Sequence, residues 1–244
     1  MINRRHFIKN TAITTASLPF LGNLSLANTN EGATEIPLNW LDQQAPTQTQ
    51  GITWGLPWQR GLVKKGSDFV VKNGATVLDS QTWPLAYWPD GSIKWTAHAI
   101  AAQKGLGNAL SVSLGKNKSD NQGLIIEENS DSILINTGKF SCKINKKGST
   151  LIESISQNGN LRASNGKLVL QVQNQASDEN GSLQTQAFEG NIEKISLEQK
   201  GSVRSVVKIE GKHANGTRAW LPFTLRLYFY ANATAIRMIH TIIF

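Results

Sequence analysis

Short apolar runs separated by glycine-containing turns recur along most of this chain and constrain its fold more than any other feature. The turn pairs are Thr137-Gly138, Lys147-Gly148, Asn158-Gly159, Asn165-Gly166, Asn180-Gly181 and Asn215-Gly216. Gly and Asn tolerate the positive φ angles that tight hairpin turns require. The runs between the turns have strand period and little helical period. We therefore predict an all-β protein with many hairpins.

The predicted strands define two domains. Ahead of residue 130 they are Asp68–Val71, Leu85–Trp88, Ile93–Ala101, Leu110–Leu114 and Leu124–Glu127. After it they are Ser132–Asn136, Phe140–Asn145, Leu151–Gln157, Leu168–Gln173, Ile192–Gln199, Val203–Lys212, Trp220–Tyr230 and Ala235–Ile243. The polar segment 115–122 has no apolar anchor, so it predicts a boundary between domains at 51–118 and 123–244. Residues 28–50, rich in Gln, are predicted to be a linker and edge segment.

The last ten residues, Ala235–Phe244, keep an apolar strand pattern to the final position. Chain termini are usually polar and frayed, and an apolar edge strand tends to associate unless it is covered. We therefore expect the second domain to be incomplete at its C-terminal end and the chain to belong to a longer polypeptide.

Residues 1–27 have the features of an export signal. Arg4-Arg5 is followed by a weakly apolar stretch that ends at Ser25-Leu26-Ala27, a spacing of small residues that suits a signal peptidase. The residues from Asn3 to Lys9 resemble a twin-arginine signal. We predict cleavage near Ala27, export by the twin-arginine machinery, and a periplasmic or extracellular location. The apolar part is too short and polar for a stable membrane span.

Charge and cysteine content narrow the function classes. The chain has 25 Lys+Arg against 17 Asp+Glu, and without the three basic residues of the leader the balance is 22 against 17, or +5. The lysines are scattered, which predicts no nucleic-acid partner, while the positive balance favours an acidic ligand. Cys142 alternates with Phe140 and Ile144 and is predicted to be buried. No spacing predicts a metal site, and no motif predicts a cofactor.

The stretch Ala86–Ile100, AYWPDGSIKWTAHAI, places an acid and a lysine between aromatic residues. One interpretation is a catalytic pair, Asp90 and Lys94. The other is a corner between two strands, because Pro fixes φ, Asp bonds nearby backbone and Gly accepts positive φ. Strand period continues from Ile93 to Ala99. We favour the corner, so Asp90 is predicted to be a turn residue.

The order of several motifs resembles one known family. Residues 52–61, ITWGLPWQRG, are followed by Gln81 and then by residues 88–95, WPDGSIKW. Later strings are Asn136–Phe140, Gly201–Arg204 and Trp220–Tyr230. Together they resemble the N-terminal region of the bacterial and fungal exo-acting rhamnogalacturonan lyases. The resemblance implies a small RIFT-like β-barrel at 51–118 followed by an antiparallel β-sandwich at 123–244.

The same resemblance implies a polysaccharide lyase that cleaves pectic rhamnogalacturonan by β-elimination, with an acidic polysaccharide or oligosaccharide as partner. Such a reaction needs a cation at the uronate carboxylate, a base for the C5 proton and an acid for the leaving oxygen. The candidates for these roles are Arg226, Tyr228 and His240, which gather on one sheet face if their strands pair suitably.

Three tryptophans, Trp54, Trp58 and Trp88, are candidates for stacking on sugar rings, although tryptophans in a small β domain more often pack in its core. The helical toroid that follows the β region in the family is not part of this sequence. Two hypotheses therefore stay open. The chain is the N-terminal, non-catalytic β portion of an exported lyase, or it is a carbohydrate-binding or structural β module without activity of its own.

Overall fold

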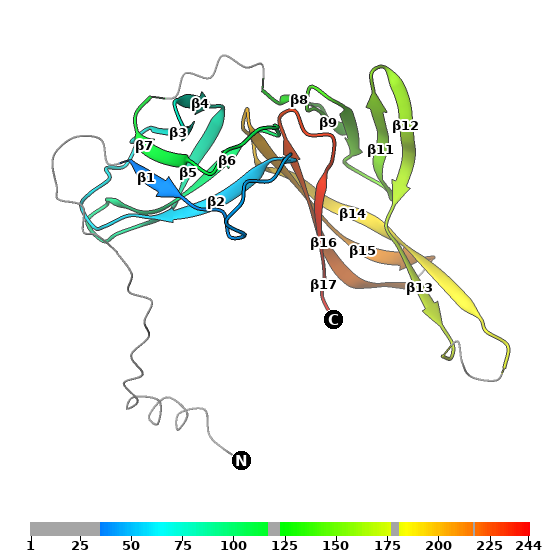
Figure 1. Ribbon diagram of the computed structural model, residues 1–244. Coiled ribbons are helices and arrows are strands. Elements are labelled where there is room, and N and C mark those ends of the chain that lie inside the picture. The colour runs from blue at the N-terminus through cyan, green and yellow to red at the C-terminus, as the bar shows by residue number, and fades with distance from the viewer. Residues whose placement is uncertain (1–34, 117–122, 177–180, 217) are drawn as a thin grey trace. The chain divides into compact units, whose positions relative to one another are not determined.

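The computed structural model describes residues 35–116, 123–176, 181–216 and 218–244, so the leader with Arg4, Arg5 and Ala27 lies outside the described residues. The regular elements in these ranges are all strands, and their pairs are antiparallel. They form four sheets (Figure 1). The predicted all-β fold is confirmed. Within the same ranges, no helix has the length and apolar character that crossing a bilayer demands.

Two small sheets build the N-terminal domain. One has the order β1 (Ile36–Leu38), β7 (Leu110–Leu114), β3 (Phe69–Asn73) and β4 (Thr76–Leu78). The other has the order β2 (Ile52–Pro57), β6 (Ile93–Ile100) and β5 (Ser80–Tyr87). Their inner faces share a core that includes Leu56, Trp58, Phe69, Val71, Ile100 and Val112. Because β1 pairs with β7, residues 36–38 of the segment predicted as linker and edge form an edge strand of this domain.

Two five-stranded sheets build the C-terminal domain. The first has the order β12 (Asn160–Lys167), β11 (Thr150–Gln157), β10 (Ser141–Asn145), β9 (Ser132–Asn136) and β8 (Ile125–Glu128). The second has the order β13 (Val169–Gln173), β14 (Thr185–Gln199), β15 (Arg204–Asn215), β16 (Arg218–Tyr230) and β17 (Arg237–Ile242). The predicted β-sandwich is therefore present.

Alternation along the strands fills the space between these two sheets. On β15, Val207 and Ile209 face inward and Lys208 faces outward, and β16 repeats the pattern. They pack against residues of β9 and β10, among them Cys142, which is fully buried as predicted. Each fully buried aliphatic side chain contributes about 1.5–3 kcal/mol through the hydrophobic effect. Because alternate residues of β15 and β16 fill this core, the residues between them lie on the outer face of the sheet.

Four strands are absent from the predicted list, β1, β2, β4 and β12, and one predicted turn is wrong. β12 has a polar sequence, NLRASNGK, and is almost entirely exposed, so no apolar alternation marks it. It pairs with β11 through the predicted Asn158-Gly159 turn, where both residues have positive φ. The predicted Asn165-Gly166 turn lies inside β12 instead, opposite a register shift between Thr150 and Ile152. A positive φ at Asn165 therefore marks a bulge and not a chain reversal.

The two domains share a third apolar cluster. Its buried members are Ala99, Ala101, Val203, Tyr230, Ala231 and Ala233. Thr53 of β2 and Tyr230 of β16 join their hydroxyl groups at 2.8 Å across this contact. Gly51 leaves the room that the Tyr230 ring occupies, because a Cβ at position 51 would lie 2.1 Å from Tyr230 Cγ. The part of β6 from Thr96 to Ile100 is consequently buried on both faces, one in the barrel core and one at the domain junction.

Candidate functional site

The Pro89-Asp90-Gly91-Ser92 segment is a corner between β5 and β6, as predicted. Asp90 Oδ1 accepts hydrogen bonds from the Ser92 backbone N–H (3.0 Å) and from the Ser92 hydroxyl (2.6 Å), and Gly91 has φ +83°. These two bonds, followed by one from Arg60, hold the pKa of Asp90 below its ordinary value. Lys94 does not pair with Asp90 but lies 4.5 Å from the Trp88 ring centroid. The acid–lysine interpretation is therefore wrong.

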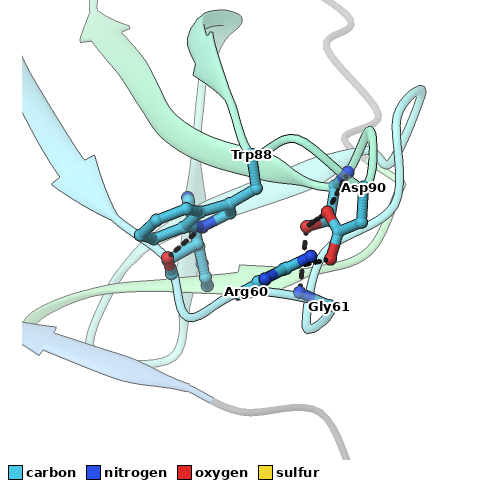
Figure 2. A network of polar contacts seen from close by, with 6 residues as sticks. Arg60, Gly61, Trp88 and Asp90 are labelled. Carbon is cyan, nitrogen blue, oxygen red and sulfur yellow. Dashed lines mark hydrogen bonds and ion pairs between the residues drawn. The ribbon is translucent and has the colours of Figure 1, made fainter.

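The corner is fastened to the loop after β2, an arrangement that the sequence did not predict (Figure 2). Arg60 Nε donates to Asp90 Oδ2 at 3.0 Å, and the Gly61 N–H donates to the Ser92 hydroxyl at 2.9 Å. Trp88 Nε1 donates to the Trp58 carbonyl at 3.0 Å. The two strings of the family resemblance thus contact each other, and their shared role is structural.

Of the three candidate tryptophans, Trp58 belongs to the core. Only 4% of its surface is exposed, and its Nε1 donates to Thr96 Oγ1 at 2.8 Å. A ring covered in this way has no free face for a sugar, so its prediction as a binding residue is corrected. Trp88 is half-buried and is occupied by Lys94 and by its bond to Trp58.

Trp54 is half-buried and lies on the inner side of β2. Its ring stacks on His98 with centroids 5.6 Å apart, and its Nε1 has no hydrogen-bond partner among the described residues. It borders a cavity between β2 and the segment that follows β1, together with Trp40. The ring face that contacts His98 is not available to a ligand.

His98 is the centre of a buried polar chain within the barrel. Its Nε2 lies 2.7 Å from Thr96 Oγ1 and its Nδ1 lies 2.9 Å from Thr82 Oγ1. Burial lowers the pKa of His98 to about 4, so the ring is neutral at neutral pH. Since both nitrogens are hydrogen-bonded inside the core, His98 stabilises the barrel and does not face a ligand. Among the described residues, no three His, Cys, Asp or Glu side chains are grouped as metal ligands.

The predicted grouping of Arg226, Tyr228 and His240 on one face does not form. Residues paired directly across an antiparallel ladder have side chains on the same face. Tyr228 pairs with Arg237 and Arg226 pairs with Ile239, whereas His240 pairs with Leu225, a core residue. His240 therefore lies on the face of Phe223, 6.2 Å from that ring, opposite to Arg226 and Tyr228.

The electrostatic surroundings of these candidates differ as well. Burial, and then the neighbouring His213, lower the pKa of His240. Arg226 donates twice to Glu198, at 2.7 and 2.9 Å, and this pairing holds the pKa of Glu198 below its ordinary value. An arginine already bound to a carboxylate in two places is not free to bind a substrate carboxylate.

The outward face of β16 meets β5 at a cluster of arginines and aromatic rings that sequence reasoning missed. The guanidinium carbon of Arg204 lies 5.0 Å from the centroids of both Trp83 and Tyr228, and that of Arg237 lies 5.6 Å from the Tyr228 centroid. We call these four residues the junction cluster. Beside them opens a depression of about 250 Å³, lined by Trp83, Glu198, Gln199, Arg204, Val206 and Tyr228.

The junction cluster suits an acidic carbohydrate. Arginine binds carboxylates in a bidentate manner, and the rings of Trp83 and Tyr228 hold the two guanidinium groups in place by cation–π contact. A signal for it was present in the sequence, because Arg204 closes the Gly201–Arg204 string and Trp83 follows Gln81 by two residues. Neither string indicates that the two side chains meet.

Comparison with known proteins identifies both domains. Residues 34–115 match the model described as the PcRGLX-like N-terminal RIFT barrel domain, and residues 124–244 match the PcRGLX-like protein central beta sandwich domain. The chain belongs to the PcRGLX-like family. The predicted resemblance to the rhamnogalacturonan lyases is thereby confirmed, and the order of the two matches agrees with the order of the domains in the structure.

The chain is also similar to a curated bacterial protein. The Uncharacterized protein YetA of Bacillus subtilis (strain 168) is 38% identical over 208 residues, which are 84% of this chain and 24% of the relative. The chain thus spans about a quarter of the length of the curated relative it matches.

Proposed function

We propose that this chain forms the non-catalytic β portion of an exported polysaccharide lyase that acts on pectic rhamnogalacturonan by β-elimination. Its barrel and sandwich are domains of the PcRGLX-like family, in the family's order. The observation that carries the binding role is the junction cluster, in which Trp83, Arg204 and Tyr228 line an open depression and Arg237 lies over the Tyr228 ring.

The described residues favour binding over cleavage for this portion. A β-elimination requires a base and an acid near the cation that neutralises the uronate. Of the predicted candidates, Arg226 is paired with Glu198 and His240 lies on the other face of the sheet. We therefore assign the elimination to residues outside these two domains. The curated relative has about four times the length of the matched region, which leaves ample chain for a catalytic domain.

Export by the twin-arginine pathway, through Arg4 and Arg5 with cleavage near Ala27, is part of this proposal and rests on the leader sequence alone. A periplasmic or extracellular enzyme would meet its polysaccharide without transporting it. Replacing both arginines by lysine in the intact precursor is expected to leave the protein in the cytoplasm. Secretion of that variant at the normal level would contradict the pathway.

The second candidate is a carbohydrate-binding or structural module whose protein has no lyase activity. The dense packing at the domain junction is equally suited to a structural support. Lyase activity separates the two functions. The protein as its organism makes it, incubated with rhamnogalacturonan, is expected to release unsaturated uronate, which absorbs in the ultraviolet. Residues 28–244 alone are expected to release none. Absence of product from both would refute the lyase proposal and leave the binding module.

A further inference from the structure

Arg204 is held at the domain junction without an anionic partner. Its guanidinium contacts Trp83 of the barrel and Tyr228 of the sandwich, and among the described residues no ion pair includes Arg204 or Arg237. The Nε of Arg204 is buried and lacks a hydrogen-bond partner among those residues. A buried guanidinium nitrogen without an acceptor is costly, and the two ring contacts offset part of this cost.

The backbone at Arg204 is fixed by the barrel. Gln81 Oε1 accepts hydrogen bonds from the backbone N–H groups of Val203 (3.2 Å) and Arg204 (2.9 Å). Gly201 leaves room for this side chain, since a Cβ there would lie 2.0 Å from Gln81 Oε1. The barrel thus sets the position at which the sandwich presents Arg204, so the cluster is complete only when both domains are in place.

The charges around the cluster favour an anionic ligand. The one carboxylate among the residues that line the depression, Glu198, is paired with Arg226 at 2.7 Å, and the charge of Arg204 acts on it more weakly. Lys208 is paired with Glu210. Arg204 and Arg237, on the two strands that flank Tyr228, form no ion pair among the described residues, and a ligand carboxylate is the complementary group.

We infer that Arg204 and Arg237 form a uronate-binding subsite, in which each guanidinium binds a sugar carboxylate and the rings of Trp83 and Tyr228 hold the guanidinium groups in place. This inference rests on the proposed function, because it takes a uronate-containing polysaccharide as the ligand class. It adds the residues that distinguish acidic from neutral sugars. The subsite includes residues of both domains, since Trp83 belongs to the barrel and the other three belong to the sandwich.

The alternative role for Arg204 is structural, as a cation that ties the domains together through two aromatic contacts. The two roles differ in what they change. A structural arginine affects the melting temperature and leaves the preference between acidic and neutral sugars unaltered. A carboxylate-binding arginine affects that preference.

The test measures binding of residues 28–244 to a galacturonate oligosaccharide and to the same oligosaccharide with its carboxyl groups reduced to alcohols. The unsubstituted chain is expected to bind the acidic form more tightly, with an affinity that falls as salt is added. Arg204→Met is expected to weaken binding of the acidic form by about tenfold or more and to leave the reduced form unaffected. Arg162→Met, on exposed β12, is the matched control and is expected to change neither affinity.

Arg237→Met provides a second variant, because Arg237 is exposed on β17 and its replacement does not endanger folding. It is expected to lower the same preference in the same direction. Equal affinity of the unsubstituted chain for the two oligosaccharides would overturn the subsite while leaving carbohydrate binding intact. Unchanged acidic affinity in both variants would overturn it too. The lyase proposal is decided separately, by product release from the complete protein.

Discussion

Mild acid is expected to destabilise the N-terminal domain through a single buried residue, His98. The folded protein keeps the pKa of His98 near 4, whereas the ordinary value of 6.5 applies once the chain unfolds. Between these two values the unfolded state binds a proton that the folded state does not. The free energy of unfolding therefore falls as the pH falls through this interval.

The magnitude follows from the two pKa values. Each pH unit between the two pKa values lowers the free energy of unfolding by about 1.4 kcal/mol. Below pH 4, where both states bind the proton, the total loss is about 3 kcal/mol. At about pH 5 the loss relative to about pH 7.5 is about 2 kcal/mol. Four carboxyl groups do not contribute to this change, because their pKa values lie below the ordinary value and they titrate at lower pH. They belong to Asp90, Glu189, Glu198 and Glu210.

Urea unfolding followed by tryptophan fluorescence measures this effect. Of the seven tryptophans, all except Trp220 lie in the N-terminal domain, so the signal reports mainly on the barrel. His98→Gln removes the titrating group and is expected to abolish most of the difference between the two pH values, at a lower overall stability. His240→Gln, on β17 of the sandwich, is the comparison: the pKa of His240 is lowered too, but the signal follows the barrel that holds His98, so most of the difference is expected to remain. An unchanged pH dependence in His98→Gln would refute the reasoning.

Three further predictions concern the corner, the junction and the core. Asp90→Ala removes the acceptor of two Ser92 hydrogen bonds. It is expected to lower the melting temperature without changing the affinity for an acidic oligosaccharide. Lost affinity at an unchanged melting temperature would contradict the corner role. Gly51→Ala places a Cβ 2.1 Å from Tyr230 Cγ. It is expected to lower the free energy of unfolding by about 1–3 kcal/mol more than Gly61→Ala, because Gly61 also has a positive φ but has open space around it. Equal effects in urea unfolding would argue against the close approach of Gly51 and Tyr230. The Cys142 thiol is fully buried and its pKa is raised to about 12 by burial, so a thiol reagent is expected to react only after the protein unfolds; rapid labelling of the native chain would place Cys142 outside the core.

Local chemistry made much of the fold predictable from the sequence. The Asn158-Gly159 reversal and the Asp90 corner depend on residues adjacent in the chain, and the structure places both as expected. β12 escaped prediction because an exposed strand needs no apolar alternation. Asn165-Gly166 was misplaced because a positive φ serves a bulge as well as a turn.

The candidate site was less predictable, because it depends on contacts between distant residues. Strand period from Ile93 to Ala99 does not show which face of β6 lines the barrel core, and in the structure that face carries Thr96 and His98. The register between β16 and β17 places Arg237, and not His240, on the same sheet face as Tyr228. The contact between Trp83 and Arg204 joins two domains, and no pattern within either segment encodes it.

The claim that acidic sugars bind at the domain junction is tested most directly by following tryptophan indole N–H signals in nuclear magnetic resonance spectra during titration with a galacturonate oligosaccharide. We expect the Trp83 signal to shift in proportion to occupancy and the signal of core Trp58 to stay unchanged. Shifts confined to Trp54 or Trp88, with Trp83 unaffected at saturation, would place the ligand elsewhere and contradict the account.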